Sequence, residues 1–331
     1  MIKYNRLIIL ESGGKVKSFL ITGGAGFIGS TLANYYSKDN QVVVIDDLSM
    51  GQTENLNTSE NITFIEGSVI DQQLMEKVLQ EYQFDYIFHL AAIASVADSV
   101  ARPVETHQVN FESVLQLLEL IRKYQKDLKR LVFASSAAVY GDEPTLPKQE
   151  ESVIRPLTPY AVDKFASEKY VLNYCHLYDV PTSAVRFFNV YGPNQNPNSP
   201  YSGVISIVMD SYKRLLANQE VTFNIFGDGK QSRDFVFVED VVQALNLVAH
   251  SDQSLGEVYN VGTGKATDLN ELISSLNDIM KVTLPVEYKE ARAGDIKDSL
   301  ADISKLRAIG YEPKYSIQSG LDKYVNYELK E

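Results

Sequence analysis

Residues 18–29 read SFLITGGAGFIG, and this stretch decides the fold. The apolar run 18–21 has the length of a buried strand, glycines follow at the spacing G-x-x-G-x-x-G, and a helix-like segment continues to Lys38. Glycine lets the backbone turn sharply and approach a pyrophosphate, while the helix N-terminus offers free N–H groups and the positive end of its dipole. The sequence therefore predicts a dinucleotide-binding strand–turn–helix unit. Its candidate cofactor-binding residues are Gly23, Gly26, Phe27, Ile28 and Gly29.

Short apolar runs alternate with helix-length stretches through the first half of the chain. Runs that are apolar on both faces are typical of buried parallel strands. The further expected strands are 41–45, 62–65, 86–90, 131–134 and 182–188, and the expected long helices are 104–124 and 159–178. This alternation predicts the α/β class, with a doubly wound parallel (Rossmann) sheet that binds ligands at the carboxyl ends of its strands.

A second, smaller α+β domain is expected after residue 188. The 331 residues are enough for about two domains. Residues 191–200 are rich in Gly, Pro, Asn and Ser, which indicates a long loop. Strand and helix signals then follow in mixed order, with a turn at 226–229. We predict a first domain over 1–188, in which 1–16 is an extension of unassigned role, and a second over 189–331, some of whose segments return to the first.

Composition and charge exclude several classes of protein. The chain carries 31 Lys and Arg against 43 Asp and Glu, giving a net charge of −12 and a pI near 4.9, which argues against a broad nucleic-acid-binding surface. The apolar run 7–10 is too short for a signal peptide, and no run of about 18 apolar residues exists. One cysteine and four scattered histidines provide neither a disulfide framework nor a metal-ligand spacing. We therefore expect a soluble, cytoplasmic protein without a metal site.

Asp46 ends the second expected strand, 17 residues after Gly29. A carboxylate at this place accepts hydrogen bonds from both ribose hydroxyls of NAD and repels the 2′-phosphate of NADP. No arginine neighbours Asp46 in the sequence. The pattern favours NAD as the cofactor, with an ordinary turn residue at a strand end as the alternative interpretation of Asp46.

Tyr160 and Lys164 lie four residues apart at the start of an expected helix, and therefore on one helix face. A tyrosine has a pKa of about 10, and a nearby ammonium and the positive nicotinamide ring lower that pKa by favouring the phenolate. Tyr160 can then take a proton from a substrate hydroxyl while the carbon beneath it loses a hydride. Ser136, 24 residues before Tyr160 at a strand end, supplies a second hydroxyl. We predict Ser136, Tyr160 and Lys164 as the catalytic residues.

These motifs resemble, in order and spacing, the extended short-chain dehydrogenase/reductase superfamily over nearly the whole chain after Lys17. Within it the sequence most resembles the UDP-sugar 4-epimerases. FASSAAVYG (133–141) is similar to their catalytic-serine segment, RFFNVYGP (186–193) to a nucleotide-sugar segment, and residues 227–237 to a uridine-diphosphate segment. The resemblance implies that domain 1–188 binds NAD and that domain 189–331 mainly binds a UDP-sugar.

The resemblance also implies individual contacts. The implied cofactor contacts are Val69, Leu90, Ala91, Ala92 and Asn110, with Tyr160 and Lys164. The implied substrate contacts are Ser136, Asn189, Phe226, Arg233, Arg292, Asp295 and Ser299. Ser68 departs from the pattern, because relatives usually carry there an acid that contacts the adenine.

Ala137 and Ala138 restrict which of the superfamily's reactions we expect this chain to catalyse. The dehydratases of this superfamily carry an acid/base pair just after their serine or threonine, and the glucuronate decarboxylases a glutamate, whereas alanine transfers no proton. This favours a 4-epimerase, which oxidises C4, rotates the 4-keto sugar, returns the hydride and retains its NAD. A 4-ketoreductase with the same catalytic residues is one alternative. A non-catalytic nucleotide-binding regulatory or structural subunit is another, against which the intact catalytic residues argue.

Two further expectations concern Ser299 and a row of tyrosines on the expected helix 159–178. In the family, a bulky tyrosine at the position of Ser299 restricts the substrate to glucose and galactose, whereas a small residue admits N-acetyl sugars. We therefore expect interconversion of UDP-N-acetylglucosamine and UDP-N-acetylgalactosamine, with the unacetylated pair also processed. Tyr170, Tyr174 and Tyr178 form one stripe on helix 159–178, with packing in the core and contact with a twin helix of a dimer as the two interpretations. Since related enzymes pair their two long helices, we expect a homodimer.

Overall fold

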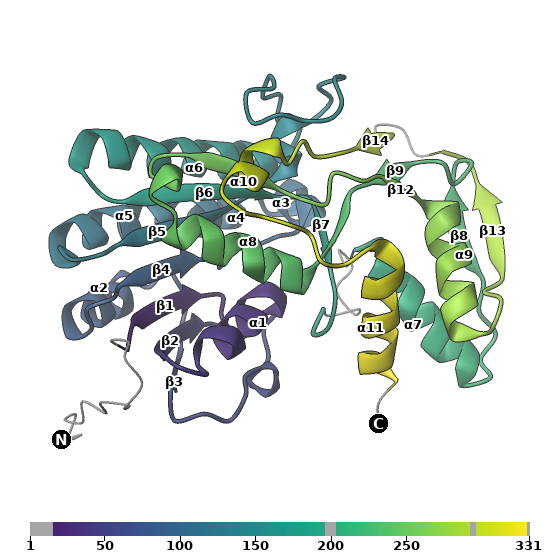
Figure 1. Ribbon diagram of the computed structural model, residues 1–331, viewed down its shortest axis with the longest axis horizontal. Helices are drawn as coiled ribbons and strands as arrows, with labels where there is room; N and C mark the ends of the chain where they lie inside the picture. Colours follow the sequence, from purple (N-terminus) through teal and green to yellow (C-terminus); the bar gives the residue numbers. More distant parts are fainter. Residues whose placement is uncertain (1–15, 196–202, 292–295, 330–331) are drawn as a thin grey trace.

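The largest unit of the fold is a seven-stranded sheet in which all neighbouring strands are parallel (Figure 1). The computed structural model describes residues 16–195, 203–291 and 296–329. The strand order is β11-β6-β5-β4-β1-β2-β3. The strands are β1 (Ser18–Thr22), β2 (Gln41–Asp46), β3 (Ile62–Glu66), β4 (Tyr86–His89), β5 (Arg130–Ser136), β6 (Thr182–Phe187) and β11 (Val258–Val261). The direction of winding reverses between β1 and β4, which is where such sheets bind dinucleotides.

The central strands of this sheet are mainly apolar on both faces because helices cover both. In β1, Phe19 and Ile21 pack into one core while Leu20 packs into the other. In β5, Val132 and Phe133 divide in the same way. Successive side chains of a strand point to opposite faces, so an unbroken apolar run is what a sheet between two helical layers requires. The predicted doubly wound parallel sheet is confirmed.

Two helical layers cover the sheet (Figure 1). One layer holds α1 (Phe27–Tyr36), α8 (Val238–His250) and α10 (Ser304–Ala308), and the other holds α2 (Gln72–Glu81), α5 (Ser113–Tyr124) and α6 (Pro159–Tyr178). The helix expected over 104–124 is instead a series of segments: α4 (Pro103–His107), the π-helical η2 (Gln108–Glu112) and α5, preceded by α3 (Val96–Ala101). The wider π turn inserts one residue into the helical repeat, which a periodicity argument does not detect. Three short 3₁₀ segments complete this part: η1 (Thr53–Asn55), η3 (Ala137–Tyr140) and η4 (Asp252–Ser254).

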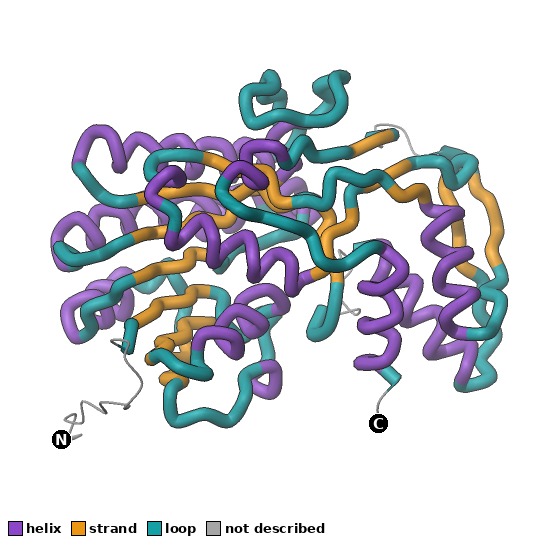
Figure 2. Tube along the Cα trace, viewed as in Figure 1, coloured by secondary structure: helices purple, strands orange, loops and turns teal. Residues whose placement is uncertain are grey.

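A smaller α+β region, which we call the small region, is built around a third core (Figure 2). Its helices are α7 (Val204–Leu216), α9 (Leu269–Met280) and α11 (Ile317–Glu328). Its strands pair as β7 (Asn189–Tyr191) with β10 (Phe235–Phe237), as β8 (Phe223–Phe226) with β13 (Val286–Lys289), and as β12 (Thr267–Asp268), β9 (Ser232–Arg233) and β14 (Asp298–Ser299). The small region lies beside the carboxyl ends of the large sheet (Figure 1).

The chain passes repeatedly between the two parts. It leaves the large sheet at the end of β6, and β7 begins only two residues after Phe187. It returns with α8, which packs in the first core, and with β11, which pairs with β6. Within the described ranges, no helix has the length and apolar character needed to cross a membrane.

Candidate active site

The glycine turn after β1 leaves no room for side chains. Gly23 has φ +69°, and a Cβ built on it would lie 2.7 Å from the backbone nitrogen of Ala91. A Cβ on Gly29 would lie 2.1 Å from the carbonyl oxygen of Gly23. Helix α1 begins at Phe27 behind Gly26, and no side chain caps its N-terminus. The first N–H groups of α1 are therefore available to an anion such as a pyrophosphate.

Asp46 ends β2 beside this turn and is 8% exposed. Its Oδ2 accepts a hydrogen bond from the Ala25 N–H at 3.0 Å, and its Oδ1 accepts one from the Leu48 N–H at 2.9 Å. A carboxylate oxygen has two acceptor positions, so each oxygen can accept one more donor. The ribose of NAD offers two adjacent hydroxyl donors, and the residues present fit this group.

The loop after β4 lies against the glycine turn. The N–H of Leu90 donates to the Thr22 carbonyl at 3.2 Å, and the N–H of Ala91 lies 3.4 Å from the Thr22 hydroxyl. Asn110, in the π segment, fixes this loop through two hydrogen bonds to Ile93. Its Oδ1 accepts from the Ile93 N–H at 2.9 Å, and its Nδ2 donates to the Ile93 carbonyl at 3.0 Å. Asn110 is 1% exposed, so much of its amide is engaged in fixing this loop.

Three other positions near the predicted cofactor site lie in the loops after β3 and β4. Val69 is buried after β3, and Ala92 is half-buried after β4. The Ser68 hydroxyl donates to Oδ2 of Asp47 at 3.1 Å. Ser68, the departure from the family pattern noted above, therefore already hydrogen-bonds to a neighbouring acid of this chain, Asp47.

The three predicted catalytic residues meet at the carboxyl end of β5. Ser136 is the last residue of β5, and its side chain is near enough to Tyr160 to act on the pKa of the phenol. Lys164 stands one helical turn after Tyr160 and donates from Nζ to the carbonyl oxygen of Ala134 at 2.8 Å. Helix α6 begins in the right place because Thr158 caps its N-terminus and Pro159 occupies its first turn. The structure thus brings Ser136, Tyr160 and Lys164 together.

Burial controls the protonation of this group. Desolvation lowers the pKa of the Lys164 ammonium to about 7, although the Asp163 carboxylate acts in the opposite direction. Desolvation also raises the pKa of Tyr160, and the hydrogen bond from Ser136 lowers it again in part. The expectation of a lowered Tyr160 pKa considered the charges of Lys164 and of the nicotinamide ring and omitted burial, which acts in the opposite direction in the protein alone.

Apart from Ser136, the predicted substrate residues that the structure describes lie on the small region. Arg233 in β9 and Ser299 in β14 are direct register partners. The Arg233 guanidinium donates to the carbonyls of Ile296 at 2.7 Å and Lys297 at 3.0 Å. Further predicted residues are Phe226, half-buried at the end of β8, and Asn189, exposed at the start of β7. Arg292 and Asp295 lie outside the described residues.

Two buried acids of the site have no counterpart in the sequence prediction. Asp234, next to Arg233, is fully buried and accepts from the N–H groups of Thr263 at 2.7 Å and Gly264 at 2.9 Å. Burial raises the pKa of Asp234, and these hydrogen bonds act against the increase. Glu168, one turn after Lys164, is fully buried and pairs with Arg186. A four-residue spacing from Lys164 was the available signal for Glu168, whereas no pattern marked Asp234.

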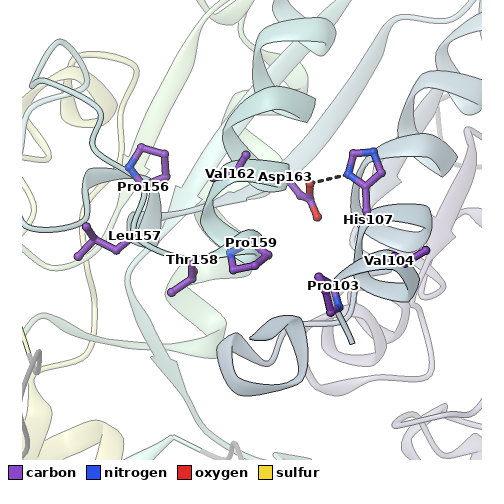
Figure 3. A pocket seen from close by; sticks show the side chains of 9 residues that line it. All are labelled: Pro103, Val104, His107, Pro156, Leu157, Thr158, Pro159, Val162 and Asp163. Carbon is purple, nitrogen blue, oxygen red and sulfur yellow. Dashed lines mark hydrogen bonds and ion pairs between the residues drawn. The ribbon is translucent and has the colours of Figure 1, made fainter. Parts of the chain in front are cut away.

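A pocket of about 560 Å³ opens on the outer side of the catalytic helix (Figure 3). It contains a hydrogen bond in which His107 Nδ1 lies 2.7 Å from Asp163 Oδ1. It is lined by Pro103, Val104, His107, Pro156, Leu157, Thr158, Pro159, Val162 and Asp163. None of the three catalytic side chains lines it, so the pocket is a feature separate from the group at the end of β5.

A protein-family model described as GDP-mannose 4,6 dehydratase matches residues 20–324. The chain belongs to this family of extended short-chain dehydrogenases/reductases. A putative UDP-glucose 4-epimerase of Methanocaldococcus jannaschii is 37% identical over 310 residues, covering 93% of this chain and 97% of that protein. The superfamily predicted from the motifs is confirmed.

Two solved structures of family members are close to this one. A UDP-N-acetylglucosamine 4-epimerase from Methanobrevibacter ruminantium, in complex with UDP-N-acetylmuramic acid, has a TM-score of 0.88 and 38% identity, covering 95% of this chain and 98% of that one. A UDP-glucose 4-epimerase of Thermus thermophilus, in complex with NAD, has a TM-score of 0.83 and 34% identity, covering 94% and 98%. At the level of the family, the predictions of an NAD-dependent enzyme and of UDP-sugar epimerase chemistry are confirmed.

Proposed function

We propose that this family member is an NAD-dependent UDP-sugar 4-epimerase that interconverts UDP-N-acetylglucosamine and UDP-N-acetylgalactosamine, and also UDP-glucose and UDP-galactose. The observation that carries the proposal is the meeting of Ser136, Tyr160 and Lys164 at the carboxyl edge of the sheet that also carries the glycine turn, with alanines at 137 and 138. The names of relatives at 37–38% identity support the same reaction class.

The residues that would hold NAD are those of the glycine turn, the N-terminus of α1 and Asp46. When bound, NAD supplies the chemistry of hydride acceptance and return at C4 of the sugar. Tyr160 moves the proton: its phenolic oxygen takes the proton of the 4-hydroxyl and later gives it back. Ser136 supplies a second hydroxyl that orients the same sugar hydroxyl, and the charge of Lys164, one helical turn along, favours the developing phenolate.

Ala137 and Ala138 restrict the steps that are open to the sugar after the first proton transfer. Both are half-buried in η3, immediately after Ser136. A dehydratase must remove a proton from C5 and protonate a leaving hydroxyl, and a methyl side chain does neither. The 4-keto sugar therefore rotates and receives its hydride on the other face, which is epimerisation.

Ser299 supports the acetylated substrates. It is half-buried in β14, next to the Arg233 position in β9. A serine leaves space that a tyrosine fills, and its hydroxyl can hydrogen-bond to an acetamido group. The Methanobrevibacter relative, named for UDP-N-acetylglucosamine, supports this choice, while the Methanocaldococcus relative is named for UDP-glucose.

The deciding experiment incubates the purified protein with each of the four UDP-sugars, without added cofactor, and separates C4 epimers by chromatography. We expect both acetylated sugars to reach equilibrium, and NAD but not NADP to be released on denaturation. A product formed only with added NADH would instead show a 4-ketoreductase. Absence of turnover with bound NAD would favour a non-catalytic nucleotide-binding subunit.

We further propose that the active form is a cytoplasmic homodimer, paired through the face formed by α3, α4 and α6. Val100, Val104 and Val162 are 64%, 73% and 49% exposed on this face, which is unfavourable for an isolated chain. Analytical ultracentrifugation should show a dimer that Val104→Asp weakens. Val153→Asp, at a similarly exposed valine of the 141–158 loop, is the control.

The domain division at residue 188 is also kept as a proposal, with α8 and β11 assigned to the first domain. Both elements pack with the large sheet rather than with the third core. Limited proteolysis is expected to cut first after residue 188. Early cuts within 1–188 would contradict the division.

A further inference from the structure

A buried polar cluster lies directly behind the catalytic group. It consists of Ser135, Tyr140, Glu168 and Arg186, and we call it the Glu168 cluster. Glu168 is 0% and Arg186 1% exposed. Charged side chains are almost never buried to this degree unless they are paired, and even then apolar residues would pack the same space without desolvating two charges. The cluster therefore calls for a reason other than stability.

The carboxylate of Glu168 is the centre of the cluster. Arg186 donates from Nε to Oε2 at 2.9 Å and from Nη2 to Oε1 at 2.6 Å, and the Ser135 hydroxyl donates to Oε2 at 2.7 Å. Burial acts to lower the pKa of Arg186, but the hydrogen bonds and charge of Glu168 hold that pKa above its ordinary value. A forked, charge-assisted pair of this kind fixes direction as well as distance.

Three elements that carry the catalytic residues meet at this carboxylate. Ser135 in β5 and Arg186 in β6 are register partners, and both reach Glu168 of α6. Ser136 is the next residue after Ser135, while Lys164 and Tyr160 precede Glu168 by one and two helical turns. The cluster thus sets both the height and the rotation of α6 over the end of β5.

We propose that Glu168 is a positioning residue for the epimerase reaction, holding Tyr160 in line with Ser136 through Ser135 and Arg186. The inference rests on the proposed function for its chemistry, but its geometric content does not. Apolar contacts are non-directional and would let α6 slide or rotate on the sheet. Hydrogen bonds from two strands to one helix residue remove that freedom, and a proton-transfer geometry depends on sub-ångström alignment.

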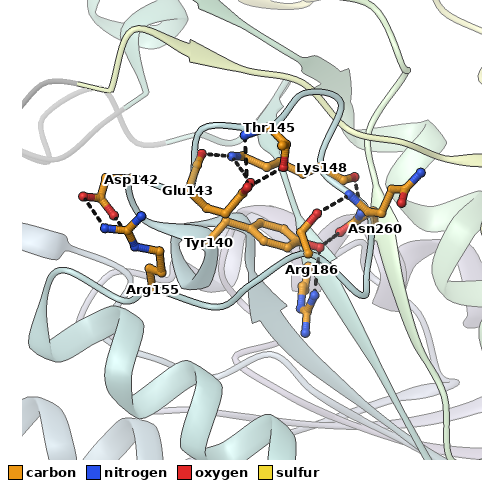
Figure 4. A network of polar contacts seen from close by, with 10 residues as sticks. Tyr140, Asp142, Glu143, Thr145, Lys148, Arg155, Arg186 and Asn260 are labelled. Carbon is orange, nitrogen blue, oxygen red and sulfur yellow. Dashed lines mark hydrogen bonds and ion pairs between the residues drawn. The ribbon is translucent and has the colours of Figure 1, made fainter.

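A second branch of the cluster reaches the small region (Figure 4). Arg186 Nη1 donates to the Tyr140 hydroxyl at 2.8 Å, which donates to Asn260 Oδ1 at 2.7 Å. Asn260 Nδ2 donates to the carbonyl of Lys148 at 2.8 Å, and the N–H of Lys148 donates to the carbonyl of Leu300 at 2.7 Å. Leu300 directly follows Ser299. The bonds that position the catalytic helix therefore continue to the strand that carries the predicted substrate gate.

The test variant is Ser135→Ala, because Glu168→Gln leaves Arg186 without its counter-charge and endangers folding. Ser135→Ala keeps the ion pair and removes one hydroxyl. Ser183→Ala is the matched control: Ser183 is also fully buried in the large sheet, on β6, and its hydroxyl donates to the Ser254 carbonyl at the other end of that strand. Both variants lose one buried hydroxyl, and Ser183→Ala also removes the acceptor of a hydrogen bond from Arg130 Nη1 at 2.8 Å, so the control is at least as disruptive as the test variant. Only Ser135→Ala touches Glu168.

We expect Ser135→Ala to lower kcat by about tenfold with KM within about twofold of the parent. Its pH–rate profile should shift to higher pH, because the hydrogen bond from Ser136 lowers the pKa of Tyr160 and misalignment removes that effect. Ser183→Ala should keep the kcat and the profile of the parent. Equal kcat and unshifted profiles in both variants would overturn the positioning role.

A crystal structure of Ser135→Ala separates this inference from the proposed function. We expect the Tyr160 hydroxyl to be displaced relative to the Ser136 hydroxyl by about 0.5 Å or more from its place in the parent. An unchanged separation would refute the positioning role even in an active enzyme. If the parent protein converts no UDP-sugar, the proposed function fails, and the displacement in this structure still decides the geometric role of Glu168.

Discussion

The carboxyl edge of the large sheet and the small region reach their geometry by different means. At the sheet edge, backbone close approach sets the shape: Gly23, Gly29 and the loop after β4 touch without room for a methyl group. In the small region, strands of only two residues, β9, β12 and β14, are held by a buried carboxylate, Asp234, and by pairing across the chain. The first part is fitted to a constant ligand, whereas the second offers side chains that can vary with the sugar.

The largest effect is expected at the sheet edge, from Tyr160→Phe. It removes only the phenolic oxygen that moves the proton, so turnover should fall by about 10²–10⁴-fold while bound NAD and folding are retained. Steady-state assays and the nucleotide released on denaturation measure this. Tyr170→Phe, on the exposed side of the same helix, is the control and should keep the activity of the parent. Normal turnover in Tyr160→Phe would remove this residue from the mechanism.

Gly29→Ala tests whether backbone contact really fixes the glycine turn. The added methyl would lie 2.1 Å from the Gly23 carbonyl oxygen, which cannot move away without shifting the strand end. We expect a loss of about 1–3 kcal/mol of unfolding free energy and a protein that purifies without NAD. In Gly26→Ala the same methyl is 3.3 Å from that oxygen, so the loss should be smaller. Equal stability of both variants would contradict the contact argument.

The large sheet could be predicted from the sequence because its signals are local. An apolar run, the glycine spacing and Asp46 stand within 29 residues of one another, and buried parallel strands have few alternatives to such runs. The catalytic Ser136, Tyr160 and Lys164 could be predicted from spacing and resemblance. Burial effects could not: the raised pKa of Tyr160 and the pairing of Glu168 with Arg186 arise only when three elements close over them.

The small region was harder to predict for a related reason. Strands β9, β12 and β14 are too short for a period-two pattern, and their pairing joins residues more than thirty positions apart. The contact between Arg233 and residues 296–297 is made with backbone carbonyls, which any sequence offers. Only the resemblance to a family brought Arg233 and Ser299 to notice, and the structure pairs them in register.

Lys164→Met tests the cost of the buried ammonium. The folded pKa of about 7 lies below the unfolded value of 10.5, so the unfolded chain binds more protons between these pH values. The free-energy cost of burying the Lys164 ammonium is therefore complete below pH 7. It decreases by about 1.4 kcal/mol for each pH unit and disappears as the pH rises to 10.5. In nucleotide-free protein, denaturant titrations should show Lys164→Met more stable than the parent at pH 6, by several kcal/mol, and inactive.

The pH dependence of that gain is the discriminating result. It should shrink steadily between pH 7 and 10, whereas Lys169→Met, at an exposed lysine of the same helix, should show no such trend. A gain that is independent of pH would mean that methionine merely packs better, and that the ammonium is not destabilised by burial.

The smallest and most selective effect belongs to the small region, from Ser299→Tyr. Ser299 is half-buried and held opposite Arg233 by strand pairing, so a larger side chain there must extend toward the predicted sugar site or disturb β14. We expect the acetylated pair to lose about 10–100-fold in kcat/KM, since a methyl-sized steric conflict is worth about 1–3 kcal/mol, while UDP-galactose turnover is spared. Ser304→Tyr adds the same side chain at an exposed serine five residues along and should change neither activity. Equal losses for both substrate pairs would indicate that Ser299→Tyr displaces β14 itself. Unchanged turnover of both pairs would show that the sugar is selected elsewhere. Only a selective loss identifies position 299 as the substrate gate, and it would show that the small region varies with the sugar while the sheet edge stays fixed to its cofactor.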